Sequence, residues 1–111
     1  MDLKVSTRQQ GDKSILSATG EVDVFTAPTL DEAISAELAE QRSRLVVDLS
    51  GVSFLDSTGL GVLVKGLKGA RDAGGSLDLV VTSDRIRRIF DITGLDASMH
   101  IFDTVADALT G

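Results

Sequence analysis

The segment Phe54-Leu55-Asp56-Ser57-Thr58-Gly59-Leu60-Gly61 places carboxylate, hydroxyl and glycine residues at a predicted strand-to-helix junction. The apolar run before it, Leu45–Leu49, is typical of a strand buried on both faces, and functional groups gather at the carboxyl ends of such strands. We expect Ser57 at the N-cap of the following helix, where unpaired N–H groups and the helix dipole would stabilise a phosphate. Helix caps of the composition Asp56-Ser57-Thr58 are common, and the local pattern alone favours a simple cap over a phosphorylation site.

The helix predicted after this turn is rich in glycine. Each interior glycine costs about 1 kcal/mol relative to alanine, and four lie on or near the helix: Gly59, Gly61, Gly66 and Gly69. With about 100° of rotation per residue, the apolar side carries Leu60, Leu63, Val64 and Leu67. The opposite side carries Gly61, Val62, Lys65 and Gly69. A glycine-lined outward face with an exposed valine suits close approach by another protein, whereas packing against a neighbouring element is the alternative for some of these glycines.

Hydrophobic periodicity predicts an α/β fold, and residues 1–111 are enough for one domain. Strands are expected at residues 3–7, 15–24, 45–49, 77–81 and 99–102, with a hairpin turn at Gly11-Asp12. Residues 15–24 form either one strand or two strands broken near Gly20. Four helices are expected, with N-caps at Thr26 or Ala27, at Ser57, at Ser83 or Asp84, and at Asp103. The helix between the two buried strands makes those strands parallel. The predicted architecture is a mixed β-sheet with an N-terminal hairpin and about four helices packed on it.

Charge and composition exclude several classes of protein. The formal net charge is −6 and the sequence pI is about 4.5, so neither nucleic acid nor a membrane surface is an expected partner. Cysteine is absent and His100 is the only histidine, so we expect no metal, no cofactor and no thiol catalysis. The sequence contains no apolar run of signal-peptide or membrane-spanning length, and the expected location is the cytoplasm.

Four segments, taken in order, carry a family resemblance. They are Gly20-Glu21-Val22-Asp23 with Ala27 and Leu30 behind it, Val46–Leu49 with Phe54–Gly61, Gly74–Val80, and Ile89–Asp96. Together they resemble the SpoIIAA-like anti-sigma factor antagonist family, whose fold is the STAS domain. The match runs from about Leu3 to Leu109. A lone Asp-Ser-Thr-Gly would be weak evidence, but four segments in the right order are strong evidence.

The resemblance implies a partner-switching regulator and not an enzyme. In the family, the unphosphorylated antagonist binds an anti-sigma factor, which is a serine kinase, and thereby releases a sigma factor. The kinase phosphorylates the serine that corresponds to Ser57, and a phosphatase reverses the reaction. Many relatives have a second serine where this chain has Thr58, so Thr58 is a rival acceptor. Asp23 matches a family aspartate that serves kinase or nucleotide contact near the phosphorylated serine, although a turn-forming role would also explain it.

The expected partner surface surrounds the phosphorylation site and comprises Asp23, Asp56, Ser57, Thr58, Gly59, Gly61, Val62 and Lys65. Two alternatives stay open at this point. STAS modules also serve as scaffold subunits of stress-sensing complexes, a role that a high-mass assembly in solution would favour. The enzymatic alternative is a small nucleotide hydrolase that uses Asp23 and Asp56, but the sequence contains no Gly-rich loop ending in Gly-Lys-Ser/Thr to hold phosphates.

Overall fold

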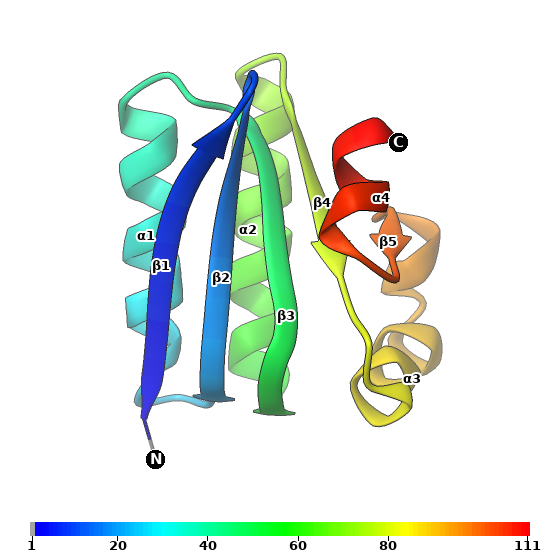
Figure 1. Ribbon diagram of the computed structural model, residues 1–111. Coiled ribbons are helices and arrows are strands. Elements are labelled where there is room, and N and C mark those ends of the chain that lie inside the picture. The colour runs from blue at the N-terminus through cyan, green and yellow to red at the C-terminus, as the bar shows by residue number, and fades with distance from the viewer. Residues whose placement is uncertain (1) are drawn as a thin grey trace.

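The computed structural model describes residues 2–111 and contains a five-stranded sheet flanked by helices (Figure 1). The strands are β1 (Leu3–Gln10), β2 (Lys13–Val22), β3 (Arg44–Leu55), β4 (Ser76–Val80) and β5 (Ile101–Phe102). The helices are α1 (Ala27–Ala39), α2 (Ser57–Asp72), α3 (Asp84–Thr93) and α4 (Val105–Thr110), with a 3₁₀ turn at Leu95–Ala97. The predicted α/β fold, with its N-terminal hairpin and four helices, is confirmed.

The strands lie in the sheet in their chain order, β1-β2-β3-β4-β5. β1 is antiparallel to β2, and β2, β3, β4 and β5 are parallel to one another. Helix α1 connects β2 to β3, and helix α2 connects β3 to β4, as parallel neighbours require. The carboxyl ends of β2 and β3 therefore lie side by side at one end of the sheet, the lower end in Figure 1, where α1 and α2 begin.

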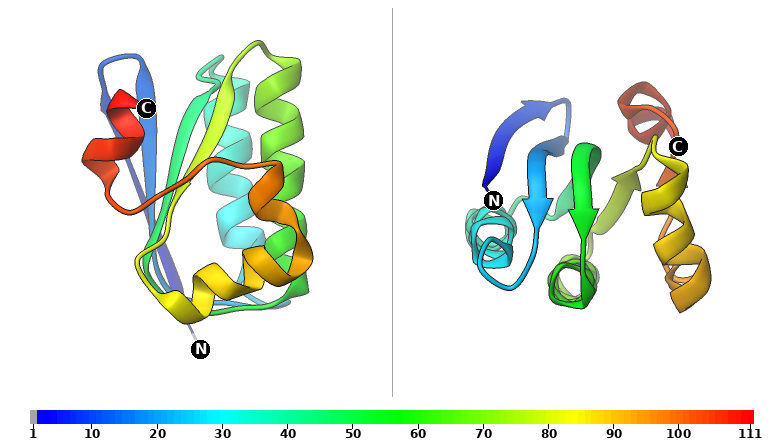
Figure 2. Two further views of the ribbon diagram at one scale, coloured as in Figure 1. Left: turned by 90° about the vertical axis from the view of Figure 1, so that its right-hand side faces the viewer. Right: turned by 90° about the horizontal axis from the view of Figure 1, so that it is seen from below.

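The two long helices cover one face of the sheet and α4 covers part of the other (Figure 2). The main core lies between the sheet and the pair α1 and α2, with buried side chains from all these elements. A smaller apolar cluster lies under α4 and consists of Ile15, Val46, Val80 and Ala108. Within residues 2–111, no helix is both long and apolar enough to cross a membrane.

Strand β3 is longer than the predicted strand at residues 45–49 and continues to Leu55. The polar pair Ser50-Gly51 interrupts the apolar run, but the pairing of β3 with β2 continues beyond a register shift between Ser17 and Thr19. Gly51 fits this irregularity because a Cβ atom there would lie 3.0 Å from the carbonyl oxygen of Ala18. The extension matters for function, because it carries the chain to the end of the sheet just before Asp56.

The C-terminal elements also differ in detail from the prediction. β5 contains only Ile101–Phe102 and is shorter than the strand expected at residues 99–102. The N-cap of α4 is Thr104, whose hydroxyl oxygen accepts a hydrogen bond from the Asp107 N–H at 3.1 Å, so the prediction of Asp103 as the cap was wrong. The Asp103 carboxylate instead pairs with Arg87 on α3, at 2.8 Å.

Candidate functional site

Asp56, not Ser57, is the N-cap of α2. Its backbone is extended, with φ −102° and ψ −173°, and its Oδ1 accepts hydrogen bonds from the N–H groups of Thr58 at 2.9 Å and Gly59 at 3.1 Å. The prediction of Ser57 at the cap was therefore wrong by one residue. The physical reason is that a carboxylate is both a good N-cap acceptor and a negative charge at the positive end of the helix dipole.

Ser57 is the first helical residue and its side chain is exposed, as is that of Thr58. Because Asp56 already occupies the N–H groups of Thr58 and Gly59, these donors are not free for a phosphate on Ser57. A phosphate placed there would instead lie next to the Asp56 carboxylate. The predicted stabilisation of a phosphate by the free N–H groups of the first turn is thus reduced, and like-charge repulsion is added.

The Asp56 turn is joined directly to the loop that follows β2. Val22 is in register with Leu55 in the last pair of the β2–β3 ladder, and the Asp56 N–H donates a hydrogen bond to the Val22 carbonyl oxygen at 3.1 Å. Asp23 is the next residue after Val22. The structure thus places Asp23 and Asp56 immediately beyond neighbouring strand ends.

The Asp23 carboxylate is committed to its own loop. Asp23 is 7% exposed, and its Oδ1 accepts hydrogen bonds from the N–H groups of Phe25 and Thr26, each at 2.9 Å. The Thr26 hydroxyl lies 3.1 Å from the same oxygen and 2.7 Å from the Glu21 carbonyl oxygen. Backbone donation, above all from Thr26, holds the pKa of Asp23 below its ordinary value of 3.8 against the opposing effect of burial. The turn-forming interpretation of Asp23 therefore has direct geometric support.

Three of the four glycines on α2 are explained by packing. A Cβ atom at Gly59 would collide with the side chains of Leu55 and Val22. One at Gly66 would lie 3.0 Å from Leu77 and 3.1 Å from Ile34, and one at Gly69 would lie 2.9 Å from Leu38. Gly61 is different, because no heavy atom lies within 4 Å of its would-be Cβ. Of these four glycines, only Gly61 has room for a side chain. Packing therefore does not explain why this position is glycine.

The predicted outward face of α2 is correct in part. Gly61 and Lys65 are exposed, but Val62 is partly buried and packs against the main core, while Val64, which was expected to be buried, is 41% exposed. The difference arises because α2 packs against α1 as well as against the sheet, which widens and rotates its buried arc. The Lys65 ammonium bridges the two helices through an ion pair with Asp31 at 3.1 Å.

The sequence of this chain matches a known protein family. The STAS domain family model matches residues 4–108. The chain belongs to the STAS family. It is 44% identical over 95 residues to the anti-sigma-B factor antagonist of Bacillus subtilis (strain 168), a match that covers 86% of each chain.

Solved structures agree with this assignment. An anti-sigma factor antagonist from Mycobacterium paratuberculosis superposes with a TM-score of 0.90 at 35% identity, covering 97% of this chain and 92% of that one. The unphosphorylated form of the anti-sigma factor antagonist SpoIIAA has the same fold, with a TM-score of 0.75 at 16% identity over 96% of this chain and 94% of that one. The predicted membership among anti-sigma factor antagonists, which are regulatory proteins and not enzymes, is confirmed.

The sequence prediction missed one feature of this STAS domain. Three large apolar side chains are exposed at the end of the sheet that carries Ser57: Val24, Phe25 and Phe54. The strand predicted to reach Val24 ends at Val22, so Val24 and Phe25 lie in a loop. The available signal was this apolar pair directly before the helix-starting Thr-Ala-Pro, since hydrophobic periodicity assigns no buried side to loop residues.

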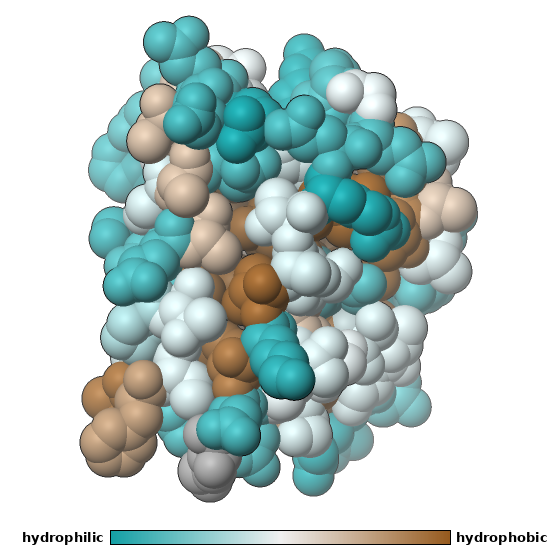
Figure 3. All heavy atoms as spheres, turned by 60° about the vertical axis from the view of Figure 1, so that its left-hand side comes forward, coloured by the Kyte–Doolittle hydropathy of each residue, from teal (hydrophilic) through white to brown (hydrophobic). Residues whose placement is uncertain are grey.

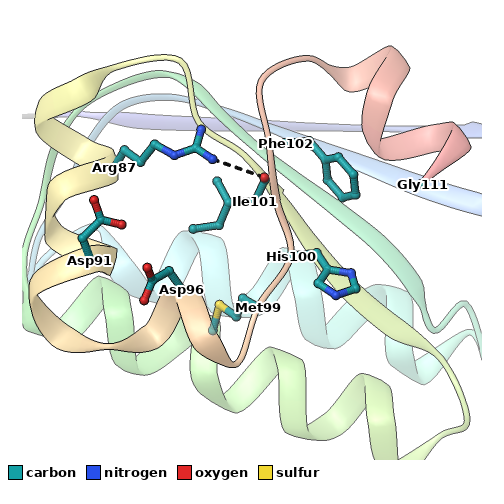
Figure 4. A pocket seen from close by; sticks show the side chains of 8 residues that line it. All are labelled: Arg87, Asp91, Asp96, Met99, His100, Ile101, Phe102 and Gly111. Atoms are coloured by element: carbon teal, nitrogen blue, oxygen red, sulfur yellow. Dashed lines mark hydrogen bonds between the residues drawn. The ribbon is translucent and has the colours of Figure 1, made fainter.

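A hollow of about 590 Å³ lies elsewhere in the STAS domain, beside α3 and β5 (Figure 4). Its polar side chains are Arg87, Asp91, Asp96 and His100, and the guanidinium of Arg87 donates to the Ile101 carbonyl oxygen at 3.4 Å. None of the predicted site residues lines it. The candidate functional site is therefore the surface formed by the Asp23 loop and the first turns of α2.

Proposed function

We propose that this protein binds an anti-sigma factor in its unphosphorylated state, thereby freeing a sigma factor, and that phosphorylation of Ser57 ends the binding. The observation that carries the proposal is the exposed Ser57 at the first position of α2, in a chain 44% identical to an anti-sigma-B factor antagonist. The anti-sigma factor itself is the proposed kinase, and a separate phosphatase restores the unmodified serine. Both proteins and their sigma factor would act in the cytoplasm.

The surface around Ser57 supports close contact with a protein partner. Gly61 is one turn further along the helix and leaves the helix backbone open to approach. Lys65, one more turn along, is held in place by its ion pair with Asp31. The proposed contact surface keeps all eight residues expected from the sequence, with Gly59 contributing through packing and Val62 through its partly exposed side only.

Phosphorylation would act on the interface far more than on the fold. A phosphate adds about −1.5 to −2 charges at neutral pH, and its repulsion by Asp56 is a surface effect that is small against a domain stability of roughly 5–15 kcal/mol. A partner packed over the turn would have to bury that charge, at several kcal/mol if no partner group neutralises it. A penalty of about 3 kcal/mol already weakens binding more than about a hundredfold.

The two alternative functions, a nucleotide hydrolase and a scaffold subunit, receive less support from the structure. The nucleotide hydrolase requires free carboxylates, but the Asp23 oxygen is used within its loop and the Asp56 oxygen caps α2. A scaffold role within a stress-sensing complex uses the same fold, and it predicts a stable assembly of high mass. Light scattering on the purified protein distinguishes it from a switch protein that assembles only with its partner.

The proposal is tested by identifying and then titrating the partner. A pull-down with the unphosphorylated protein, read by mass spectrometry, should recover a kinase-like anti-sigma factor. Incubation of the two purified proteins with ATP should place one phosphate on Ser57, as shown by phosphopeptide mapping, and calorimetry should then register weaker binding. Modification mainly on Thr58, or tight binding by the phosphorylated form, would contradict the proposal.

A further inference from the structure

The loop between β2 and α1 holds two apolar side chains in solvent. Phe25 is 86% exposed and Val24 is 59% exposed, and Phe54 on the adjoining strand is 45% exposed. Figure 3 shows hydrophobic side chains projecting at the lower end of the molecule, where this loop lies. An exposed aromatic gains nothing from burial within its own chain, and such side chains mark contact sites for other proteins when they gather in one region.

Although its apolar side chains are exposed, the backbone of this loop is held by hydrogen bonds. The Asp23 carboxylate binds the N–H groups of Phe25 and Thr26, and the Asp23 N–H donates to the Thr26 hydroxyl oxygen at 2.9 Å. The Ala27 N–H donates to the Asp23 carbonyl oxygen at 2.8 Å. These bonds enclose Val24 and Phe25, so the two apolar side chains project from an ordered turn. Ordering before binding reduces the entropy lost when a partner docks.

The loop adjoins the Ser57 turn. Glu21 is in register with Phe54, and the Val22 carbonyl oxygen accepts from the Asp56 N–H. A protein that covers Ser57 therefore meets the exposed apolar side chains in the same contact.

We propose that Asp23 is a positioning residue and that its loop presents Phe25, with Val24, as an apolar anchor that inserts into the anti-sigma factor beside Ser57. This rests on the proposed function. The partly exposed carboxylates beside the anchor are those of Glu21 and Asp56, whereas the Asp23 carboxylate is buried within its loop. The complementary surface is therefore an apolar pocket with a basic rim. The same acidic flanks and the net charge of −6 disfavour an anionic lipid surface as the occupant.

The first test compares Phe25→Ala with Ile92→Ala, using the anti-sigma factor recovered by the pull-down and calorimetry. Ile92 lies on α3 and is 77% exposed, so its truncation removes a similar apolar surface outside the proposed contact. Phe25→Ala should weaken binding at least tenfold with an unchanged melting temperature, whereas Ile92→Ala should bind like the wild type. Equal binding by Phe25→Ala and the wild type, or an equal loss in both variants, would overturn the anchor.

The second test separates positioning from direct contact by Asp23. Asparagine keeps the Oδ1 acceptor and loses the charge, so Asp23→Asn should retain binding within about threefold, and Asp23→Ala should lose it as Phe25→Ala does. Amide hydrogen exchange at Phe25 and Thr26 in the free protein should accelerate only in Asp23→Ala, and Asp23→Ala combined with Phe25→Ala should cost little more than either change alone. A loss in Asp23→Asn as large as in Asp23→Ala would assign Asp23 to direct charge contact. Failure of the wild type to bind would overturn the proposed function itself, whereas normal wild-type binding with an unaffected Phe25→Ala overturns only the anchor.

Discussion

Gly59 lies against the side chain of Val22, and no space for a Cβ atom exists between them. Gly61, two residues along the same helix, has open space at the corresponding position. Gly59→Ala should therefore destabilise the protein by about 1–3 kcal/mol through overpacking. Gly61→Ala should stabilise it by up to about 1 kcal/mol, because alanine is the better helix former. Urea unfolding of the two variants measures both effects, and a loss of stability in Gly61→Ala would contradict the packing explanation.

Asp56 should contribute to stability through its cap. Asp56→Ala leaves the N–H groups of Thr58 and Gly59 without their acceptor, and we expect a loss of about 1 kcal/mol. Asp56→Asn retains an acceptor oxygen and should lose only a fraction of that amount. Chemical denaturation compares the two, and equal losses would mean that charge, and not hydrogen bonding, sets the contribution of Asp56.

Variants of Ser57 should separate binding from folding. Ser57→Ala should bind the anti-sigma factor constitutively, and Ser57→Glu should bind at least about tenfold more weakly, since one charge reproduces part of the effect of a phosphate. Both should melt close to the wild type, because the side chain is exposed. Thr58→Ala is the control and should remain switchable by the kinase. A Thr58→Ala protein that no longer responds to ATP and kinase would transfer the switch to that residue.

A large side chain at Gly61 should weaken partner binding without destabilising the fold. Gly61→Glu places a large charged side chain where no atom of the chain lies within 4 Å, so the fold has room for it. Binding to the anti-sigma factor should weaken while the melting temperature stays within a few degrees of the wild type. Ala106→Glu adds the same charge at an exposed position of α4 and serves as the control. Normal binding by Gly61→Glu would place the interface elsewhere.

Asp78 should make stability depend on pH. Burial raises the pKa of this carboxyl above its ordinary value of 3.8, against the opposing charges of His100 and Lys13. The folded state then holds a proton that the unfolded state releases, so stability falls as pH rises from 3.8 through the folded pKa. Asp78→Asn should gain stability relative to the wild type at pH 7 and lose that gain below pH 3.8. Urea unfolding of both proteins between acidic pH and neutral pH tests this prediction. A stability difference between Asp78→Asn and the wild type that does not change with pH would contradict it.

Local patterns were sufficient for most of the fold. The apolar run Leu45–Leu49, the helix stop at Gly74-Gly75 and the Ser83 cap each depend on neighbours within a few residues, and the structure contains all three. The choice between Asp56 and Ser57 as cap was harder, because both types are good caps. It depends on which side chain reaches the N–H groups once β3 has fixed the direction of the chain.

The site was less predictable where tertiary contacts determine which side chains are buried. The burial of Val62 and the exposure of Val64 depend on the position of α1 beside α2, which helical periodicity in a single segment does not contain. Phe25 is exposed in a loop whose backbone is held by the Asp23 carboxylate, and apolar residues in loops have no periodicity to assign a side.

The ordered state of the Asp23 loop and of the Asp56 turn before any partner arrives has a kinetic consequence. Association with a preformed surface requires no folding step, so its rate constant should fall in the range of about 10⁵–10⁷ M⁻¹s⁻¹ that is typical of docking between two rigid patches. The lifetime of the complex would then be set by how well the partner fits, and the response time of the cell by how fast a phosphate is attached and removed. Under the proposed phosphorylation switch, the domain would add no folding step to the response, whose speed would depend on dissociation of the complex and on the modifying enzymes.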